Sequence, residues 1–297
     1  MSIEVQYYQN GGNASVSLGW SPPGSNPFGA AVAAARNADV AVVFASNSSG
    51  EGGDLADIAL PGTQNDLISA VAGANPRTVV VLQTGSAVTM PWVDKAGGVL
   101  EAWYNGQEDG NAIADVLFGD VNPSGKLPVT FPRSLADVPA HTPAQWPGAN
   151  NQVQYSEGLK VGYRWYDATG IAPLFPFGYG LSYTSFSFTN LAVGKPDASG
   201  SVRVTAWITN TGHRRGADVA ELYLGIPAAG EPSSQLKGFA RVDLMPGQSQ
   251  SVTFTLSRQD LSYWNTATHG WAEPTGTFKI MVGDSSRSLP LVGGLTL

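Results

Sequence analysis

The sequence predicts an α/β sandwich with a mostly parallel sheet, followed by an all-β sandwich of the immunoglobulin or fibronectin type. Helical and strand patterns alternate over residues 27–132, and short strands with period-two alternation follow from about residue 183. The 297 residues are enough for two hydrophobic cores. We therefore expect a first domain over 27–135 and a second over 183–297, joined by an ordered connector over 136–182.

The first domain has the βαβα order that gives a parallel sheet with helices on both faces. Its helical segments carry caps or apolar residues at helical spacing, and the first has an Asn cap with Pro at the first position. Its strands are apolar and rich in Val, as in a sheet buried on both faces. The segments in chain order are "NPFGAAVAAARNA", "DVAVVFAS", "TQNDLISAVAGA", "RTVVVLQTG", "GGVLEAWY" and "EDGNAIADVLFG".

The second domain reads as six short strands separated by Gly, Pro, Asn and Ser turns. Several alternate with period two, as Val202, Val204, Ala206 and Ile208 do, which indicates an antiparallel sandwich. The strands are "TSFSFTNLAV", "SVRVTAWITNTG", "ADVAELYLGIP", "QLKGFARVDL", "SQSVTFTLS" and "GTFKIMVGDSS". The connector between the domains holds too much aromatic surface, in "YRWYD" and "PLFPFGYG", to be left in water.

Residues 1–26 fit neither domain. The segment "IEVQYYQNGGNASVSLGWSPP" predicts a hairpin that turns at "NGGN", and two strands alone are marginal in water. We interpret it as the end of a β domain lying upstream. It lacks the basic-then-apolar pattern of a signal peptide.

Composition excludes several classes of function. A formal net charge of −7 with 16 Lys and Arg disfavours nucleic acid as a partner, and no apolar run of about 18 residues predicts a membrane span. The absence of Cys excludes thiolate chemistry, and the three His have no metal-ligand spacing, so no metal or cofactor is expected. The eight Trp suit a carbohydrate-handling surface only weakly. The compartment stays open, with an extracellular or periplasmic location slightly favoured.

Three loops follow the carboxyl ends of the predicted parallel strands, where ligands bind in open α/β sheets. They are "SNSSGEGGD", "QTGSAVTMPW" and "YNGQEDG". Their acids and amides should therefore converge on one rim. These residues are Glu51, Asp54, Gln107, Glu108 and Asp109.

Glu51 is the leading chemical candidate on this rim. Its flanking glycines let the backbone approach a ligand and present the carboxyl group outward, as a general acid requires. The alternative is that Gly50, Gly52 and Gly53 only form a tight turn with a solvated acid. A phosphate cradle is disfavoured because no Lys follows. A glycosidase would need a second carboxyl group, for which the local options are Asp54, Asp57, Glu101, Glu108 and Asp109.

Other polar and aromatic residues are better explained by structure than by chemistry. Glu101 lies in a strand beside Trp103 and should satisfy a structural hydrogen bond. Lys126 and Asp120 are better explained by a turn that braces the sheet than by sugar contact. The connector aromatics should pack between the domains. They are Tyr163, Trp165, Tyr166, Phe175, Phe177 and Tyr179.

Several long motifs, in order, resemble the C-terminal half of glycoside hydrolase family 3 β-glucosidases. They are "SGEGGDLADIALPGTQNDLISAV", "NPRTVVVLQTGSAVTMPW", "VLEAWYNGQEDGNAIADVLFGDVNPSGKLPVTFP" and "YSEGLKVGYRWYD…PLFPFGYGLSYTSFSF". "NTGHRRGADVAELYLG", "QLKGFARVDLMPGQS" and "GTFKIMVGDSSR" resemble that family's fibronectin type III-like domain. The first residues are similar to the last strands of a PA14 domain, which some members carry.

The resemblance implies a retaining enzyme in which Glu51 is the general acid/base, because it falls on the Glu of a Glu-Gly-x-Asp-Arg loop. Asp54 matches the Asp of that motif and is expected to support or bind, as are Gln107 and Glu108. Leu55 stands where Arg is usual, so the loop lacks an ionic support. Gly53 stands where an aromatic residue often lines the aglycone site.

The family's nucleophile is an Asp on an N-terminal (β/α)8 barrel, and nothing in this sequence resembles that barrel. We therefore expect the chain alone to be inactive and to need a barrel-containing N-terminal part or partner chain. Its substrate would be a β-glucoside or oligosaccharide with a terminal non-reducing β-D-glycosyl residue. The alternative is a non-catalytic carbohydrate-binding or structural module that braces a partner. The chain could also be a fragment of a complete enzyme.

Overall fold

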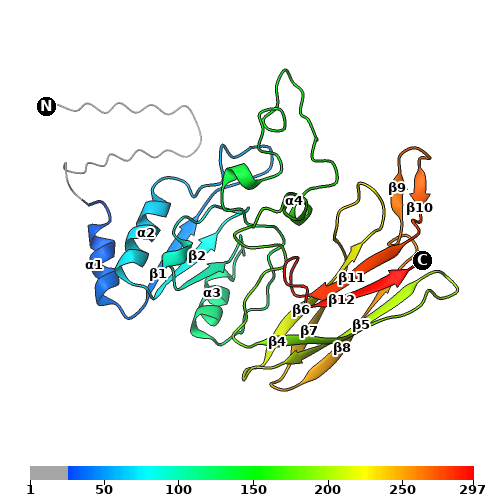
Figure 1. Cartoon of the computed structure of the whole chain (residues 1–297). Helices are drawn as coiled ribbons and strands as arrows, with labels where there is room; N and C mark the ends of the chain where they lie inside the picture. Colours follow the sequence, from blue (N-terminus) through cyan, green and yellow to red (C-terminus); the bar gives the residue numbers. More distant parts are fainter. Residues whose placement is uncertain (1–25) are drawn as a thin grey trace.

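The structure is a computed structural model that describes residues 26–297 (Figure 1). Residues 1–25, which hold nearly all of the predicted N-terminal hairpin, lie outside the described part. The described chain runs from the α/β domain through an aromatic connector into the β-sandwich.

The first domain is a three-stranded parallel sheet with the strand order β1-β2-β3. β2 lies in the centre, with Val80 opposite Val43 of β1 and Val99 of β3. Its elements in chain order are α1 (Gly29–Asn37), β1 (Ala41–Ser46), α2 (Gln64–Ala74), β2 (Thr78–Gln83), the 3-10 turn η1 (Val93–Lys95), β3 (Gly98–Glu101) and α3 (Asp109–Phe118).

Alternation along β2 gives the two faces of the sheet different partners. Val80 and Leu82 are buried in a cluster with Ile68 of α2. Val81 points the other way and is buried with Ile113 of α3. Helices therefore cover both faces, as the βαβα pattern predicts.

Two element ends differ from the sequence prediction. The first helix begins at Gly29, two residues later than an Asn26 cap implies, although the Asn26 side chain still accepts the Phe28 N–H at 2.9 Å. The third strand ends at Glu101, well before Tyr104, because Trp103 has a φ of 56° that a strand does not allow.

The connector contains the 3-10 turn η2 (Leu135–Asp137) and the helix α4 (Tyr163–Thr169). Its aromatic side chains pack between the domains, as predicted. The Tyr163 ring lies 5.3 Å from Phe177 and 5.6 Å from Tyr223 of the β-sandwich, centroid to centroid, and Phe175 stacks on Tyr179.

The second domain is an antiparallel sandwich of a four-stranded sheet, β12-β11-β6-β7, and a three-stranded sheet, β4-β5-β8, with a separate β9–β10 hairpin. Residues such as Ile208, Leu222 and Ile280 fill the space between the sheets. The strands are β4 (Phe186–Val193), β5 (Val202–Asn210), β6 (Gly216–Gly225), β7 (Gln235–Leu244), β8 (Ser249–Leu256), β9 (Tyr263–Asn265), β10 (Gly270–Ala272), β11 (Thr277–Gly283) and β12 (Leu291–Thr296).

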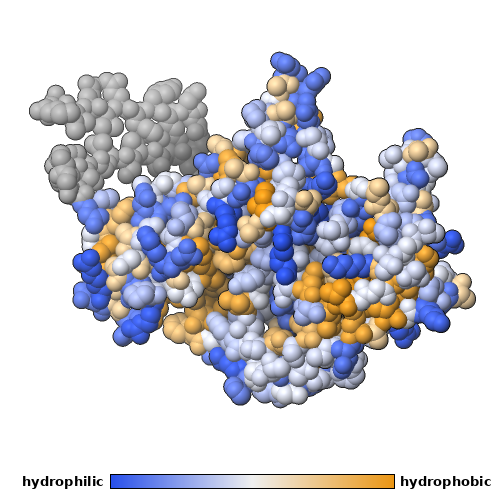
Figure 2. Space-filling model, in the orientation of Figure 1, coloured by the Kyte–Doolittle hydropathy of each residue, from blue (hydrophilic) through white to orange (hydrophobic). Residues whose placement is uncertain are grey.

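The sequence prediction contains six of these strands and lacks β9, β10 and β12. β9 and β10 have three residues each, too few for an alternation to be recognised, and β12 contains Gly293 and Gly294, which weaken a strand pattern. On the face shown in Figure 2, apolar side chains gather over this domain. Exposed Val292 on β12 belongs to its apolar surface.

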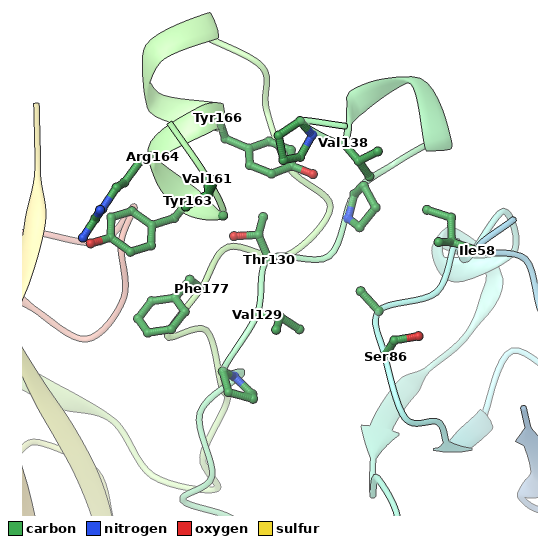
Figure 3. A pocket seen from close by; sticks show the side chains of 15 residues that line it. Ile58, Ser86, Val129, Thr130, Val138, Val161, Tyr163, Arg164, Tyr166 and Phe177 are labelled. Atoms are coloured by element: carbon green, nitrogen blue, oxygen red, sulfur yellow. The ribbon is translucent and has the colours of Figure 1, made fainter. Parts of the chain in front are cut away.

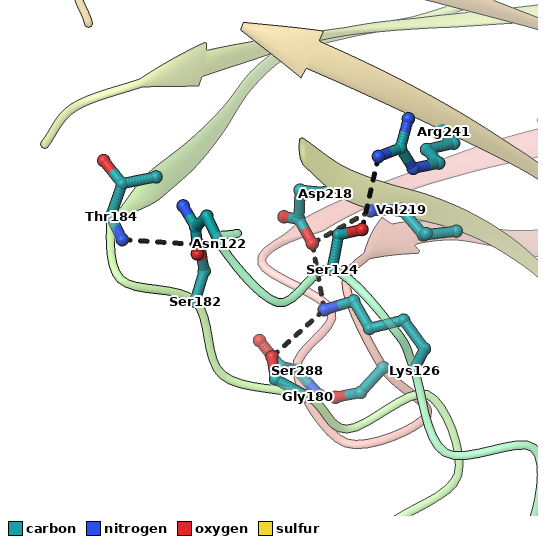
Figure 4. Close-up of polar contacts among 11 residues, drawn as sticks. Asn122, Ser124, Lys126, Gly180, Ser182, Thr184, Asp218, Val219, Arg241 and Ser288 are labelled. Atoms are coloured by element: carbon teal, nitrogen blue, oxygen red, sulfur yellow. Dashed lines mark hydrogen bonds and ion pairs between the residues drawn. The ribbon is translucent and has the colours of Figure 1, made fainter. Parts of the chain in front are cut away.

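Buried polar contacts join the two domains (Figure 4). Lys126 Nζ lies 2.9 Å from Asp218 Oδ1, and both side chains are almost fully buried. Asn122 donates to the Arg215 carbonyl at 3.0 Å and accepts the Ser182 hydroxyl at 3.0 Å. The Lys126 contact confirms the prediction that this segment braces the fold.

Candidate active site

The loops after β1, β2 and β3 meet at one edge of the sheet, as the parallel topology requires. The Tyr104 hydroxyl accepts the Ser49 N–H at 3.1 Å and donates to the side chain of Asn47 at 2.8 Å. The same Asn47 side chain accepts the Gly85 N–H at 3.1 Å. One tyrosine and one asparagine therefore tie the three loops together.

Close packing at this junction requires glycine at position 85. A Cβ there would clash with Ser49 Oγ and lie 2.8 Å from the Tyr104 ring. The sequence analysis did not single out Asn47, Tyr104 or Gly85. Their only signal is their position directly after predicted strands.

Glu51 lies at the turn of the first loop, and its side chain is exposed. Within residues 26–297 its carboxylate has no hydrogen-bond or ion-pair partner. Of the neighbouring glycines only Gly52 has a positive φ, 79°, which L side chains rarely adopt. Gly50 and Gly53 have open space around them, so the turn itself requires one glycine and the others keep the surroundings of Glu51 clear.

The first loop is also held by the connector. Trp146 donates its indole N–H to Asp54 Oδ2 at 3.3 Å, across 92 positions of sequence. Figure 1 shows the two segments side by side at the same end of the sheet. At the start of the loop's following helix, Gln64 accepts the Ser46 N–H at 2.8 Å and donates to the Ser46 carbonyl at 2.9 Å. Leu55 is partly exposed, and Trp146 contacts the loop that lacks the usual arginine.

The acids and amides of the third loop lie on the same edge. Glu108 is exposed, directly precedes α3 and accepts the Asn111 amide at 2.6 Å. Asp109 accepts hydrogen bonds from Asn105, at 3.0 Å, and from Gln83. Gln107 is exposed. The carboxylates of Glu108 and Asp109 are thus engaged in local bonds, which leaves Glu51 as the free acid among these rim residues.

Glu101 satisfies structural hydrogen bonds, as predicted. Its carboxylate accepts the Trp103 N–H at 3.1 Å and the Thr84 hydroxyl at 3.2 Å. Burial raises the pKa of Glu101 to about 7, against these two hydrogen bonds, which favour the ionised form. Glu101 therefore connects the ends of β2 and β3 beneath the rim.

An apolar cavity of about 530 Å³ lies beside the rim, between the loops and the connector (Figure 3). Ile58 and Ser86 line it from the loops, and Val138, Tyr166 and Phe177 line it from the connector. Burial raises the pKa of Tyr166 to about 12. A sugar needs polar partners for its hydroxyl groups, so this apolar cavity is a poor glucose site.

Within residues 26–297, no cluster of three or more His, Asp or Glu is arranged to hold a metal ion. None of the helices described in that range is long and apolar enough to cross a membrane. The arrangement at the rim offers an exposed carboxyl group with amide and hydroxyl groups near it, which suits proton transfer to a polar ligand.

Comparison with known proteins assigns the family. The model of the glycosyl hydrolase family 3 C-terminal domain matches residues 6–183, and that of a fibronectin type III-like domain matches residues 218–286. The chain therefore belongs to glycoside hydrolase family 3 and consists of its C-terminal α/β domain and a fibronectin type III-like domain. A PA14 domain is not among the matched families.

The relatives are glycosidases about three times as long as this chain. Thermostable beta-glucosidase B of Acetivibrio thermocellus is 46% identical over 87% of this chain and 35% of its own length. An exo-alpha-(1->6)-L-arabinopyranosidase of Bifidobacterium breve is 42% identical over 87% of this chain and 35% of its own. The crystal structure of DesR, a beta-glucosidase from Streptomyces venezuelae in complex with D-glucose, superposes with a TM-score of 0.88 at 43% identity, covering 91% of this chain and 35% of that one.

Proposed function

We propose that this chain is the acid/base-bearing C-terminal part of a retaining, exo-acting β-glycosidase of the β-glucosidase type. The observation that carries the proposal is the placement of Glu51. It is an exposed, unpartnered carboxyl group on the ligand-facing rim of a family 3 α/β domain. The relatives named as beta-glucosidases support the substrate class, a terminal non-reducing β-D-glycosyl residue.

In the proposed reaction Glu51 acts twice. Its carboxyl group first donates a proton to the glycosidic oxygen while the bond from that oxygen to C1 breaks and a carboxylate nucleophile bonds to C1. The resulting Glu51 carboxylate then takes a proton from water, whose oxygen bonds to C1 and releases the nucleophile. Asp54 holds the loop through Trp146, while Gln107 and Glu108 lie at the edge of the site.

The nucleophile and the sugar-binding walls would come from a barrel-containing N-terminal part or partner chain. The described residues leave Glu51 exposed, whereas acid/base catalysis works best in a site from which water is excluded. The chain on its own is therefore proposed to be inactive. Which β-glycoside is cleaved depends on that other part, since one relative is named for an arabinopyranoside rather than a glucoside.

The test compares the chain alone with the chain joined to a barrel. Residues 1–297 are assayed on an aryl β-glucoside, and then again after replacing the corresponding C-terminal third of the Acetivibrio thermocellus relative. We expect no turnover by the chain alone and turnover by the chimaera. Turnover by the isolated chain would refute the half-site proposal.

The role of Glu51 is tested in the same active chimaera. Glu51→Ala should lower kcat/KM for a phenyl glucoside by about 10²–10⁴-fold, the contribution usual for a general acid/base. Glu108→Gln is the matched control, since it alters another exposed rim acid and should change activity by less than about threefold.

A further inference from the structure

The β9–β10 hairpin carries two exposed tryptophans that face each other across the strands. Trp264 and Trp271 are directly opposite in the antiparallel register, and their rings form an edge-to-face pair with centroids 5.7 Å apart. Their exposed fractions are 48% and 57%. The adjacent Tyr263 points the other way and packs against the sandwich core. The hairpin is thus anchored on one face and turns its two indoles outward.

Planar polar side chains lie beside these rings. Glu273 follows Trp271 by two positions, and the alternation of exposed and half-buried residues places the two on the same face. Glu273 forms an ion pair with Arg258, and both side chains are partly exposed. These two residues also line a polar hollow of about 360 Å³ that includes Ser199.

We propose that Trp264, Trp271, Arg258 and Glu273 form an accessory binding site for a soluble β-glucan chain. An indole face stacks against the C–H face of a pyranose ring, while guanidinium and carboxylate groups bond to its hydroxyls. The rings stand at 80° to each other, so they form a corner for a single sugar ring. This geometry does not match the flat surface of crystalline cellulose. The choice of β-glucan rests on the proposed glycosidase function.

The hairpin has a position that suits this role. It projects from the body of the fibronectin-like domain and rises on the same side of the molecule as the rim loops and the connector (Figure 1). A glucan held there would be retained near the edge of the α/β domain that carries Glu51. The site would act by raising the local concentration of substrate chains.

The test is direct binding by residues 1–297, which needs no turnover. The probes are a water-soluble β-1,3/1,4-glucan in native affinity electrophoresis and cellohexaose in a titration of indole fluorescence. The chain should be retarded by the glucan, and its emission should change on titration. A Trp264→Ala/Trp271→Ala variant should lose affinity by about tenfold or more. Arg258→Ala should weaken binding by about threefold to tenfold.

Two further variants separate binding from hairpin stability. Trp264→Tyr/Trp271→Tyr keeps a cross-strand aromatic pair and should retain binding within about threefold. Trp207→Ala removes an equally exposed indole from β5 and should bind like the unmodified chain. The proposal is overturned if the unmodified chain shows neither retardation nor a fluorescence change. It is overturned too if Trp207→Ala loses as much affinity as the double alanine variant, or if only crystalline cellulose is bound. Glu51→Gln should bind glucan unchanged, so failure of the catalytic proposal would leave this result intact.

Discussion

The fibronectin-like domain and the rim of the α/β domain are held together by different means. In the former, β6 pairs with β7 and β11 on its two sides, and its residues from Ala220 to Leu224 are buried. At the rim, a few side-chain bonds such as those from Tyr104 and Trp146 hold loops that are otherwise exposed. The strongly paired region provides stability, while the loosely held region presents the proposed chemistry. The following predictions test that division, from the largest expected effect to the smallest.

Removing Lys126 should unfold the boundary between the two domains. Its ammonium group is the ion-pair partner of buried Asp218, so Lys126→Met leaves a buried carboxylate without its cation. The free energy of unfolding should fall by about 3–5 kcal/mol, measured by urea denaturation at pH 7. The double variant Lys126→Met/Asp218→Leu should recover most of that loss. If the single variant unfolds at the same urea concentration as the parent, the ion pair does not brace the domains.

Glu221 should make the sandwich domain less stable as pH rises. Burial raises its pKa to about 7, with Asp284 and Asp218 adding to the rise, while the Tyr223 hydroxyl at 2.5 Å and Lys126 oppose it. Below an unfolded pKa near 4.5 both states are protonated. Between there and about pH 7 only the unfolded state loses its proton, so stability falls as the pH rises.

Glu221→Gln removes this titration. The variant should match the parent near pH 4 and exceed it by up to about 3 kcal/mol at pH 8. Urea denaturation at the two pH values checks the sign. A variant that is less stable than the parent at pH 8 would mean that Glu221 is ionised and stabilising in the folded protein.

Trp146→Phe should weaken the support of the Glu51 loop without unfolding the protein. The change removes the indole N–H that Asp54 accepts, a bond worth about 1 kcal/mol. In the active chimaera we expect a threefold to tenfold loss of kcat/KM on a phenyl glucoside, on the order of that energy, with the thermal midpoint nearly unchanged. Trp165→Phe is the control, because its indole bonds to the Asp137 carbonyl within the connector. An equal loss of activity in both variants would show that Trp146 has no particular effect on the loop.

The sequence predicts those features that have a local pattern. The parallel strands and the alternation along β5 were recognisable because each residue's face follows from its position, and the rim followed from the strand order. The bracing role of Lys126 and the packing of Tyr163 were also correctly expected.

The missing features depend on contacts between distant residues. The Trp146–Asp54 bond spans 92 positions, and the Tyr104–Asn47 bond spans 57. Neither leaves a periodic signal in the chain. The strands β9 and β10 are too short to show one, and their tryptophans gain meaning only once they are seen to be paired and exposed.

The leaving-group dependence of the Glu51→Ala chimaera tests the central proposal most directly. Without its acid, kcat/KM should fall by about 10²–10⁴-fold for a phenyl glucoside and far less for a dinitrophenyl glucoside, whose leaving group needs no proton. Added azide should restore turnover of the dinitrophenyl substrate and give a β-glucosyl azide. Equal losses on both substrates, or little loss on either, would contradict the assignment of Glu51 as the acid/base.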